Sequence, residues 1–98
     1  MRFAKVVGTT VSTAKDPGLG ALKLLLCVPC AVDGSEEPGA ERFVAADTVG
    51  AGVGEVVLVA FGSAARVTAR TERAPTDATV VGIVDSIQVG NRTVFRKG

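Results

Sequence analysis

The stretch from Arg42 to Phe61 reads RFVAADTVGAGVGEVVLVAF, with two apolar segments on either side of a run rich in glycine. Arg42–Ala46 and the valine-dense Glu55–Phe61 have the composition of short strands. The connection between them, Asp47–Gly54, has glycine at every second position from Gly50, which suits unusual backbone conformations. The stretch therefore predicts two consecutive strands joined by a glycine-rich loop.

The loop Gly50-Ala51-Gly52-Val53-Gly54 contains a G-x-G, but it does not match a nucleotide-binding motif. A dinucleotide fingerprint needs G-x-G-x-x-G followed by a helix, whereas here the third glycine comes one position early and β-branched valines follow. A Walker loop needs G-K-[ST], and here the acidic Glu55 follows instead and would repel phosphate. Two interpretations remain open: a plain flexible loop, or a tight backbone turn packed against copies of itself, where no Cβ fits.

The remainder of the chain alternates short β segments with turns rich in Gly, Pro and Asp. The predicted strands are, in order, Phe3–Val11, Ala21–Val28, Arg42–Ala46, Glu55–Phe61 and a long Thr79–Val89. Gly62–Arg66 suits one helical turn, and a Gly90-Asn91 turn returns the chain as Arg92–Phe95. Closing the sheet removes unpaired strand edges. We therefore expect an all-β fold, a single domain over 1–98, built as a small five-stranded barrel with a short helical turn and a C-terminal hairpin.

The composition favours self-association. Of the 98 residues, 47% are apolar, and the mean hydropathy of +0.37 is high for a small monomer with a polar surface. The longest apolar run, Leu24–Val32, is interrupted by Pro29 and falls short of the roughly 20 residues that cross a bilayer. No continuous apolar segment follows Arg2 and Lys5, so no signal peptide is expected. Either an ordinary apolar core or a covering partner chain explains the excess, and we prefer the partner chain.

Charge and residue usage argue against several functions. The net charge is +1, so no electrostatic attraction to nucleic acid or anionic lipid is expected. Four Phe and no Trp or Tyr leave little on which bases could stack. The absence of histidine excludes Ser–His and Cys–His catalysis within the chain. Carboxylate chemistry by Asp47 and Glu55, which flank the glycine loop, stays formally open.

The two cysteines, Cys27 and Cys30, are separated by Val28 and Pro29 in a C-V-P-C motif. A redox pair of this spacing normally opens a helix, whereas this motif ends a Leu-rich strand. Zinc needs four ligands, and the chain offers two thiols and no imidazole. We therefore interpret both as apolar core residues and expect no metal and no cofactor.

The motifs resemble those of the bacterial microcompartment vertex proteins, of the ethanolamine-utilisation and carboxysome type. The similarity rests on D-T-V-G-A-G-V-G-E at 47–55, G-S-A-A-R at 62–66, V-V-G-T-T-V-S-T-A-K at 6–15, L-K-L-L-L at 22–26 and A-P-T-D-A-T-V-V-G-I-V-D at 74–85. It covers nearly the whole chain in the same order and spacing.

The resemblance implies a barrel like that of oligonucleotide-binding folds, assembled as a homopentamer. Such a pentamer caps the corners of a polyhedral shell in the bacterial cytoplasm, beside hexameric shell proteins, and is not an enzyme. By the same resemblance, a pore loop at the fivefold axis comprises Gly50, Ala51, Gly52, Val53 and Gly54, lined by backbone and by Ala51 or Val53. The candidates for polar contacts between subunits are Glu55, Arg66, Asp77 and Asp85. The alternative is an oligonucleotide-binding-like module that binds nucleic acid.

Overall fold

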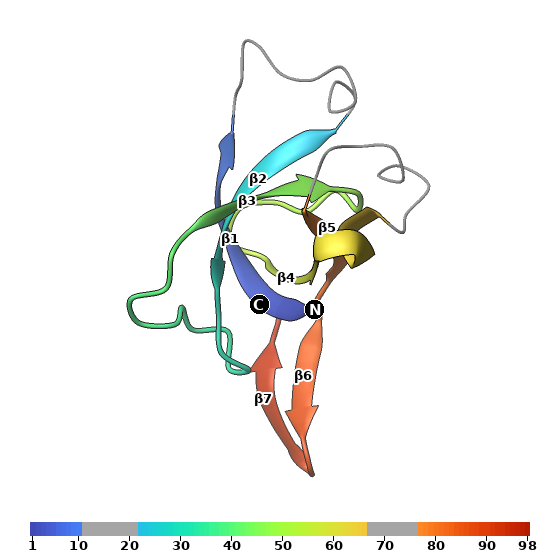
Figure 1. The fold of residues 1–98 in the computed structure, drawn as a ribbon. Coiled ribbons are helices and arrows are strands. Elements are labelled where there is room, and N and C mark those ends of the chain that lie inside the picture. Colours follow the sequence, from blue (N-terminus) through green and yellow to red (C-terminus); the bar gives the residue numbers. More distant parts are fainter. Residues whose placement is uncertain (11–21, 67–76) are drawn as a thin grey trace.

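A computed structural model describes residues 1–10, 22–66 and 77–98 (Figure 1). The strands are β1 (Arg2–Thr10), β2 (Lys23–Pro29), β3 (Phe43–Asp47), β4 (Val56–Phe61), β5 (Ala78–Ile83), β6 (Ser86–Val89) and β7 (Arg92–Arg96). A 3-10 turn over Gly62–Arg66 follows β4. The first five strands close a barrel in the order β1-β2-β3-β5-β4, and β6 and β7 form a separate hairpin. The all-β prediction of a five-stranded barrel with a helical turn and a terminal hairpin is confirmed.

The barrel is mixed, because β3 and β5 run parallel while every other neighbouring pair is antiparallel. Strand β1 pairs with β4 through its first half and with β2 through most of its length. Between Val6 and Gly8 its register shifts, as at a β-bulge. Bulges bend and twist a strand, which is what a narrow barrel needs to close.

Small side chains fill the barrel interior. Ala4 and Val6 from β1, and Val57 and Val59 from β4, alternate inward along their strands, as the period of two in a pleated strand requires. The buried core cluster consists of Ala4, Val6, Leu25, Cys27, Ala45, Ala51, Val57, Val59, Ala78 and Val80. Part of the outward surface is apolar as well, with Phe3 of β1 and Leu58 of β4 packed in a second cluster.

The hairpin covers part of that outward face before it projects beyond the barrel (Figure 1). A lone two-stranded hairpin is marginally stable in water, so its base must pack against the rest of the fold. Ile87 and Phe95 supply this contact, against the buried Cys30, Val56 and Val84. The Phe95 ring also lies against Gly34, where an added Cβ would come within 2.6 Å of it.

The prediction of one long strand over Thr79–Val89 is wrong. Strand β5 ends at Ile83, and β6 begins at Ser86. Between them, Val84 donates its N–H to the Val56 carbonyl at 2.9 Å and buries its side chain under the hairpin. The chain therefore leaves the barrel at the joint between β5 and β6, because Val84 packs into the outer apolar cluster and not into the barrel core.

The other predicted boundaries agree within about two residues, the usual uncertainty of strand ends. Val11 and Ala21, predicted ends of the first two strands, lie outside the described residues. The turn at Gly90-Asn91 is confirmed by the Val89–Arg92 pairing. Gly90 has a φ of 61° and Asn91 does not have a positive φ, which fits a type II′ hairpin turn.

Candidate functional site

The glycine-rich loop begins at a buried carboxylate. Asp47, the last residue of β3, is 3% exposed, and its two oxygens accept the N–H groups of Val49 and Ala51, each at 3.0 Å. Thr48 beside it donates its hydroxyl to the Val80 carbonyl of β5 at 2.8 Å. These three hydrogen bonds tie the first half of the loop to β3 and β5, so it is a structured connection rather than a plain flexible loop.

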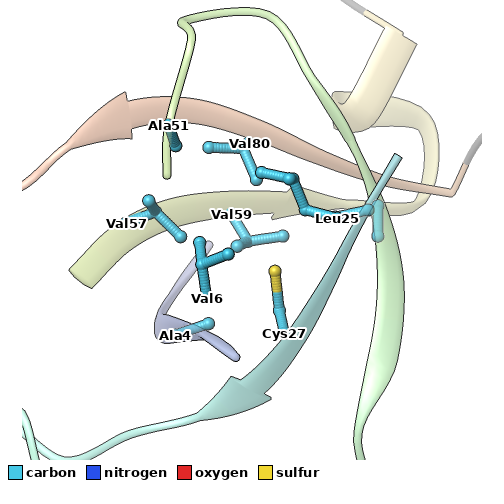
Figure 2. Close-up of a cluster of buried hydrophobic side chains, with 10 residues drawn as sticks. Ala4, Val6, Leu25, Cys27, Ala51, Val57, Val59 and Val80 are labelled. Atoms are coloured by element: carbon cyan, nitrogen blue, oxygen red, sulfur yellow. The ribbon is translucent and has the colours of Figure 1, made fainter. Parts of the chain in front are cut away.

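Ala51 closes the barrel core from the loop side. Its side chain is fully buried, and Figure 2 shows it among the core side chains beside Val57 and Val80. Its carbonyl accepts a hydrogen bond from the Lys23 ammonium group at 3.2 Å. The prediction that the Ala51 side chain lines a pore is therefore corrected, because the methyl group fills the core and exposes nothing to an axis.

The second half of the loop is a tight turn from Gly52 to Glu55. The Glu55 N–H donates to the Gly52 carbonyl at 3.2 Å, and Gly54 between them has a φ of 94°. A positive φ at the third residue defines a type II turn and favours glycine. The Gly54 N–H donates to the Val6 carbonyl at 2.8 Å, which joins the turn to β1.

The three glycines of the loop differ in whether their own backbone conformation requires a glycine. Gly50 and Gly54 have φ values of 78° and 94°, so their own backbone disfavours a side chain. Gly52 does not have a positive φ, and a Cβ added there would lie 3.6 Å from the nearest atom, Glu55 Oε1. The described residues of one chain therefore leave room for a Cβ at position 52.

Glu55 is bound inside its own chain. Its Oε1 accepts the Gly52 N–H at 2.7 Å, while its Oε2 lies 2.8 Å from the ammonium group of Lys97. The hydrogen bond from Lys97, and then that from Gly52, lower the pKa of Glu55. The same pair raises the pKa of Lys97, with a smaller contribution from Asp85. Lys97 therefore contacts Glu55 through its ammonium group and Asp85 through its backbone N–H.

The other two predicted interface residues lie elsewhere. Asp77 is exposed, and its carbonyl accepts the Gly62 N–H at 2.9 Å, next to the 3-10 turn. Arg66 ends that turn, and its side chain lies outside the described part of the structure. Sequence reasoning did not pair Lys97 with Glu55, because nothing near Lys97 in the chain signals a carboxylate from a distant loop.

The catalytic and redox alternatives gain no support from the geometry. The carboxylate oxygens of Asp47 accept N–H groups of the loop. Those of Glu55 accept one loop N–H group and the ammonium group of Lys97. Cys27 and Cys30 are buried and free, as predicted for core residues. Burial, and then Asp47, raise the pKa of Cys27 to about 11, and burial chiefly raises the pKa of Cys30. Among residues 1–10, 22–66 and 77–98, the structure has no helix long and apolar enough to span a membrane.

The closed barrel and the structured glycine loop define a class of small all-β proteins. Comparison with known proteins identifies the family within that class. The model of the family described as ethanolamine utilisation protein EutN/carboxysome matches residues 1–85. The chain belongs to this EutN/CcmL family of bacterial microcompartment shell vertex proteins.

Relatives from several organisms match nearly the whole chain. The carboxysome shell vertex protein CcmL of Gloeobacter violaceus is 43% identical over 97 residues, covering 99% of this chain and 95% of the relative. The structure of CcmL from Nostoc sp. PCC 7120 is similar with a TM-score of 0.91 at 47% identity, covering 99% of this chain and all of the other. The structure of GrpN, a pentameric microcompartment shell protein from Rhodospirillum rubrum, has a TM-score of 0.76 at 41% identity and covers 93% and 100% of the two chains.

Proposed function

We propose that this chain is a structural shell subunit that closes into a cyclic homopentamer and caps the vertices of a bacterial microcompartment. The observation that carries the proposal is the match of fold and sequence, over 93% of the chain, to a shell protein described as pentameric. The proposed location is the shell of such a compartment in the cytoplasm.

Exposed apolar side chains support self-association. Val53 at the tip of the glycine loop is 63% exposed, and Val49 in the same loop is 39% exposed. Phe61, 36% exposed, stacks at a tilt against Phe43 with ring centroids 5.3 Å apart. These two rings border an open depression of about 420 Å³ just before the 3-10 turn, a segment we assign to the subunit interface. A cyclic ring needs two different complementary patches on each subunit, and these surfaces supply candidates for both.

The energetics of such a ring are favourable in order of magnitude. About 500 Å² of apolar surface buried per interface would contribute on the order of 12 kcal/mol before the costs of association. Lost rigid-body freedom and side-chain ordering consume much of this gain. The remainder is still comparable with the stability of a domain of this size, so folding and assembly reinforce each other.

We place the loop at the fivefold axis. Its opening is then bordered by backbone groups of Gly50, Gly52 and Gly54 and by the Val53 side chain, while Ala51 lies fully buried behind them. The room for a Cβ at position 52 supports this placement, because nothing in residues 1–10, 22–66 and 77–98 requires a glycine there. Glu55, Arg66, Asp77 and Asp85 stay our candidates for polar contacts at the interface, and Glu55 and Asp85 would act beside Lys97.

The partners follow from geometry. Flat sheets of hexameric shell proteins cannot close a polyhedron without fivefold defects, and a pentamer supplies one at each corner. We therefore propose hexameric shell proteins as the neighbours of the assembled ring, contacted through its rim.

Native mass spectrometry of the purified protein tests the assembly. The expected species is about 50 kDa, five times the 9.9 kDa chain. A stable monomer at micromolar concentration would contradict the proposal. Co-expression with a hexameric shell protein should then yield closed particles that fail to close without this chain. A gel shift with single-stranded nucleic acid at low salt tests the alternative function, a nucleic-acid-binding module. That function predicts binding that weakens as salt is added.

A further inference from the structure

Lys97 joins three segments that are far apart in the sequence. Its backbone N–H donates to the carbonyl of Asp85, at the joint between β5 and β6, at 2.8 Å. Its ammonium group lies 2.8 Å from Glu55 Oε2, at the end of the glycine loop. The residue itself directly follows β7 of the hairpin. The end of the hairpin is thus fastened through one residue to both the joint and the loop.

The carboxylate of Glu55 serves two partners with different oxygens. Oε1 accepts the Gly52 N–H at 2.7 Å, so the Glu55 side chain bonds back to the first residue of the turn. Oε2 accepts a hydrogen bond from the Lys97 ammonium group. A carboxylate is planar, so an ammonium group that fixes one oxygen also directs the other. Lys97 therefore aims Oε1 at the backbone of Gly52 without touching the loop backbone itself.

The two halves of the loop depend on different supports. The first half is held by the buried Asp47 carboxylate and by Ala51 in the core. The second half lies outside the core, with Val53 exposed at its tip. The Gly54 N–H holds it to Val6 of β1, and the Glu55 carboxylate holds the Gly52 N–H. Gly52 is consequently the point in the loop that Lys97 reaches through the Glu55 carboxylate.

We propose that the Glu55–Lys97 ion pair is a strap from the C-terminal hairpin to the Gly52–Glu55 turn, and that Lys97 is a positioning residue for the loop. The strap itself needs only a single folded chain. Its consequence for an opening at the fivefold axis rests on the proposed function, since it would let the hairpin set the shape of that opening.

Hydrogen exchange of the Gly52 amide, measured by NMR on the protein in its native assembly state, tests the strap. Lys97→Met should raise the exchange rate at Gly52 about two- to five-fold, as expected for loss of one exposed ion pair. Lys97→Arg should keep the wild-type rate, because it keeps the charge within reach. Arg96→Met, a change to the exposed neighbouring residue at the end of β7, is the matched control and should leave the rate unchanged.

Repeating the Lys97→Met substitution in a Glu55→Gln variant tests whether Lys97 acts through the charge of Glu55. In Glu55→Gln, which retains an acceptor for Gly52 but removes the charge, adding Lys97→Met should change the Gly52 rate no further. An unchanged rate in Lys97→Met alone, or the same acceleration in the Glu55→Gln background, would overturn the strap. Native mass spectrometry of the same samples separates this result from the proposed function. A monomer with a Lys97-dependent rate contradicts only the pentamer, and a pentamer with no such dependence contradicts only the strap.

Discussion

Replacing Gly52 by valine separates two reasons for a glycine: the backbone of one chain and the approach of other chains. Among the residues that the structure describes, the site has room for a Cβ, because its φ is not positive and the nearest atom to an added Cβ lies at ordinary contact distance, 3.6 Å. The free energy of unfolding of a subunit should therefore change by no more than about 0.5 kcal/mol, as for other surface substitutions. Gly52→Ala adds only the Cβ and serves as the milder member of the series.

In the ring the same change is costly. If the loops of all copies converge on one axis, each valine overpacks a contact at about 1–3 kcal/mol, which sums to on the order of 5–15 kcal/mol per pentamer. Gly54→Ala is the matched contrast. The φ of 94° at this position disfavours any side chain, so the substitution should destabilise each folded subunit by about 1–2 kcal/mol, whether or not the subunit is assembled.

Native mass spectrometry over a dilution series, with circular dichroism of the same samples, measures both effects. Gly52→Val should give folded subunits that assemble only at much higher concentration than wild type. Gly54→Ala should lower the melting temperature with a smaller loss of assembly. Normal assembly of Gly52→Val would refute the placement of the loop at a crowded axis, and an unfolded Gly52→Val chain would refute the reasoning about space within one subunit.

Three further predictions follow from the polar and thiol groups. Asp47→Asn should lower the free energy of unfolding by about 1–3 kcal/mol in urea titrations, because its amide cannot accept both buried loop N–H groups, and an unchanged midpoint would contradict that role. The pKa of Glu55 is lowered from its ordinary 4.5, so the ion pair with Lys97 stabilises the fold fully above pH 4.5 and is lost as pH falls through the lower folded value. The difference in melting temperature between wild type and Lys97→Met should therefore vanish in acid, and a difference that persists at pH 2 would argue for packing instead. Cys27 and Cys30, buried with raised pKa values, should react with iodoacetamide only as fast as the protein opens, and rapid labelling of the native protein would show that they are accessible.

The strands, the turns and the barrel class could be predicted from the sequence, whereas the point where the chain leaves the barrel could not. Valine-dense segments, the Gly90-Asn91 turn and the helical turn at Gly62–Arg66 follow from neighbouring residues alone. The break after Ile83 was invisible, because the apolar residues continue through Val84 and Ile87 and only the outer cluster decides where the strand leaves the barrel.

The candidate site shows the same division. The glycine pattern marked the loop, and the family resemblance implied that Ala51 or Val53 lines a pore. The Asp47 carboxylate instead holds the N–H of Ala51 and so directs its methyl group into the core. The pairing of Glu55 with Lys97 depends on where the hairpin docks, and no local pattern encodes that position.

A pulsed dipolar measurement on spin labels attached at Val53→Cys tests most directly the claim that five copies meet at the glycine loop. The native cysteines are buried, so the labels should report position 53 alone. A ring of five predicts two distances in a ratio of about 1.6, the diagonal and the side of a regular pentagon, and both should be short because the loop is near the axis. A single distance, a ratio of about 1.4 as in a ring of four, or the absence of dipolar coupling would contradict the pentamer.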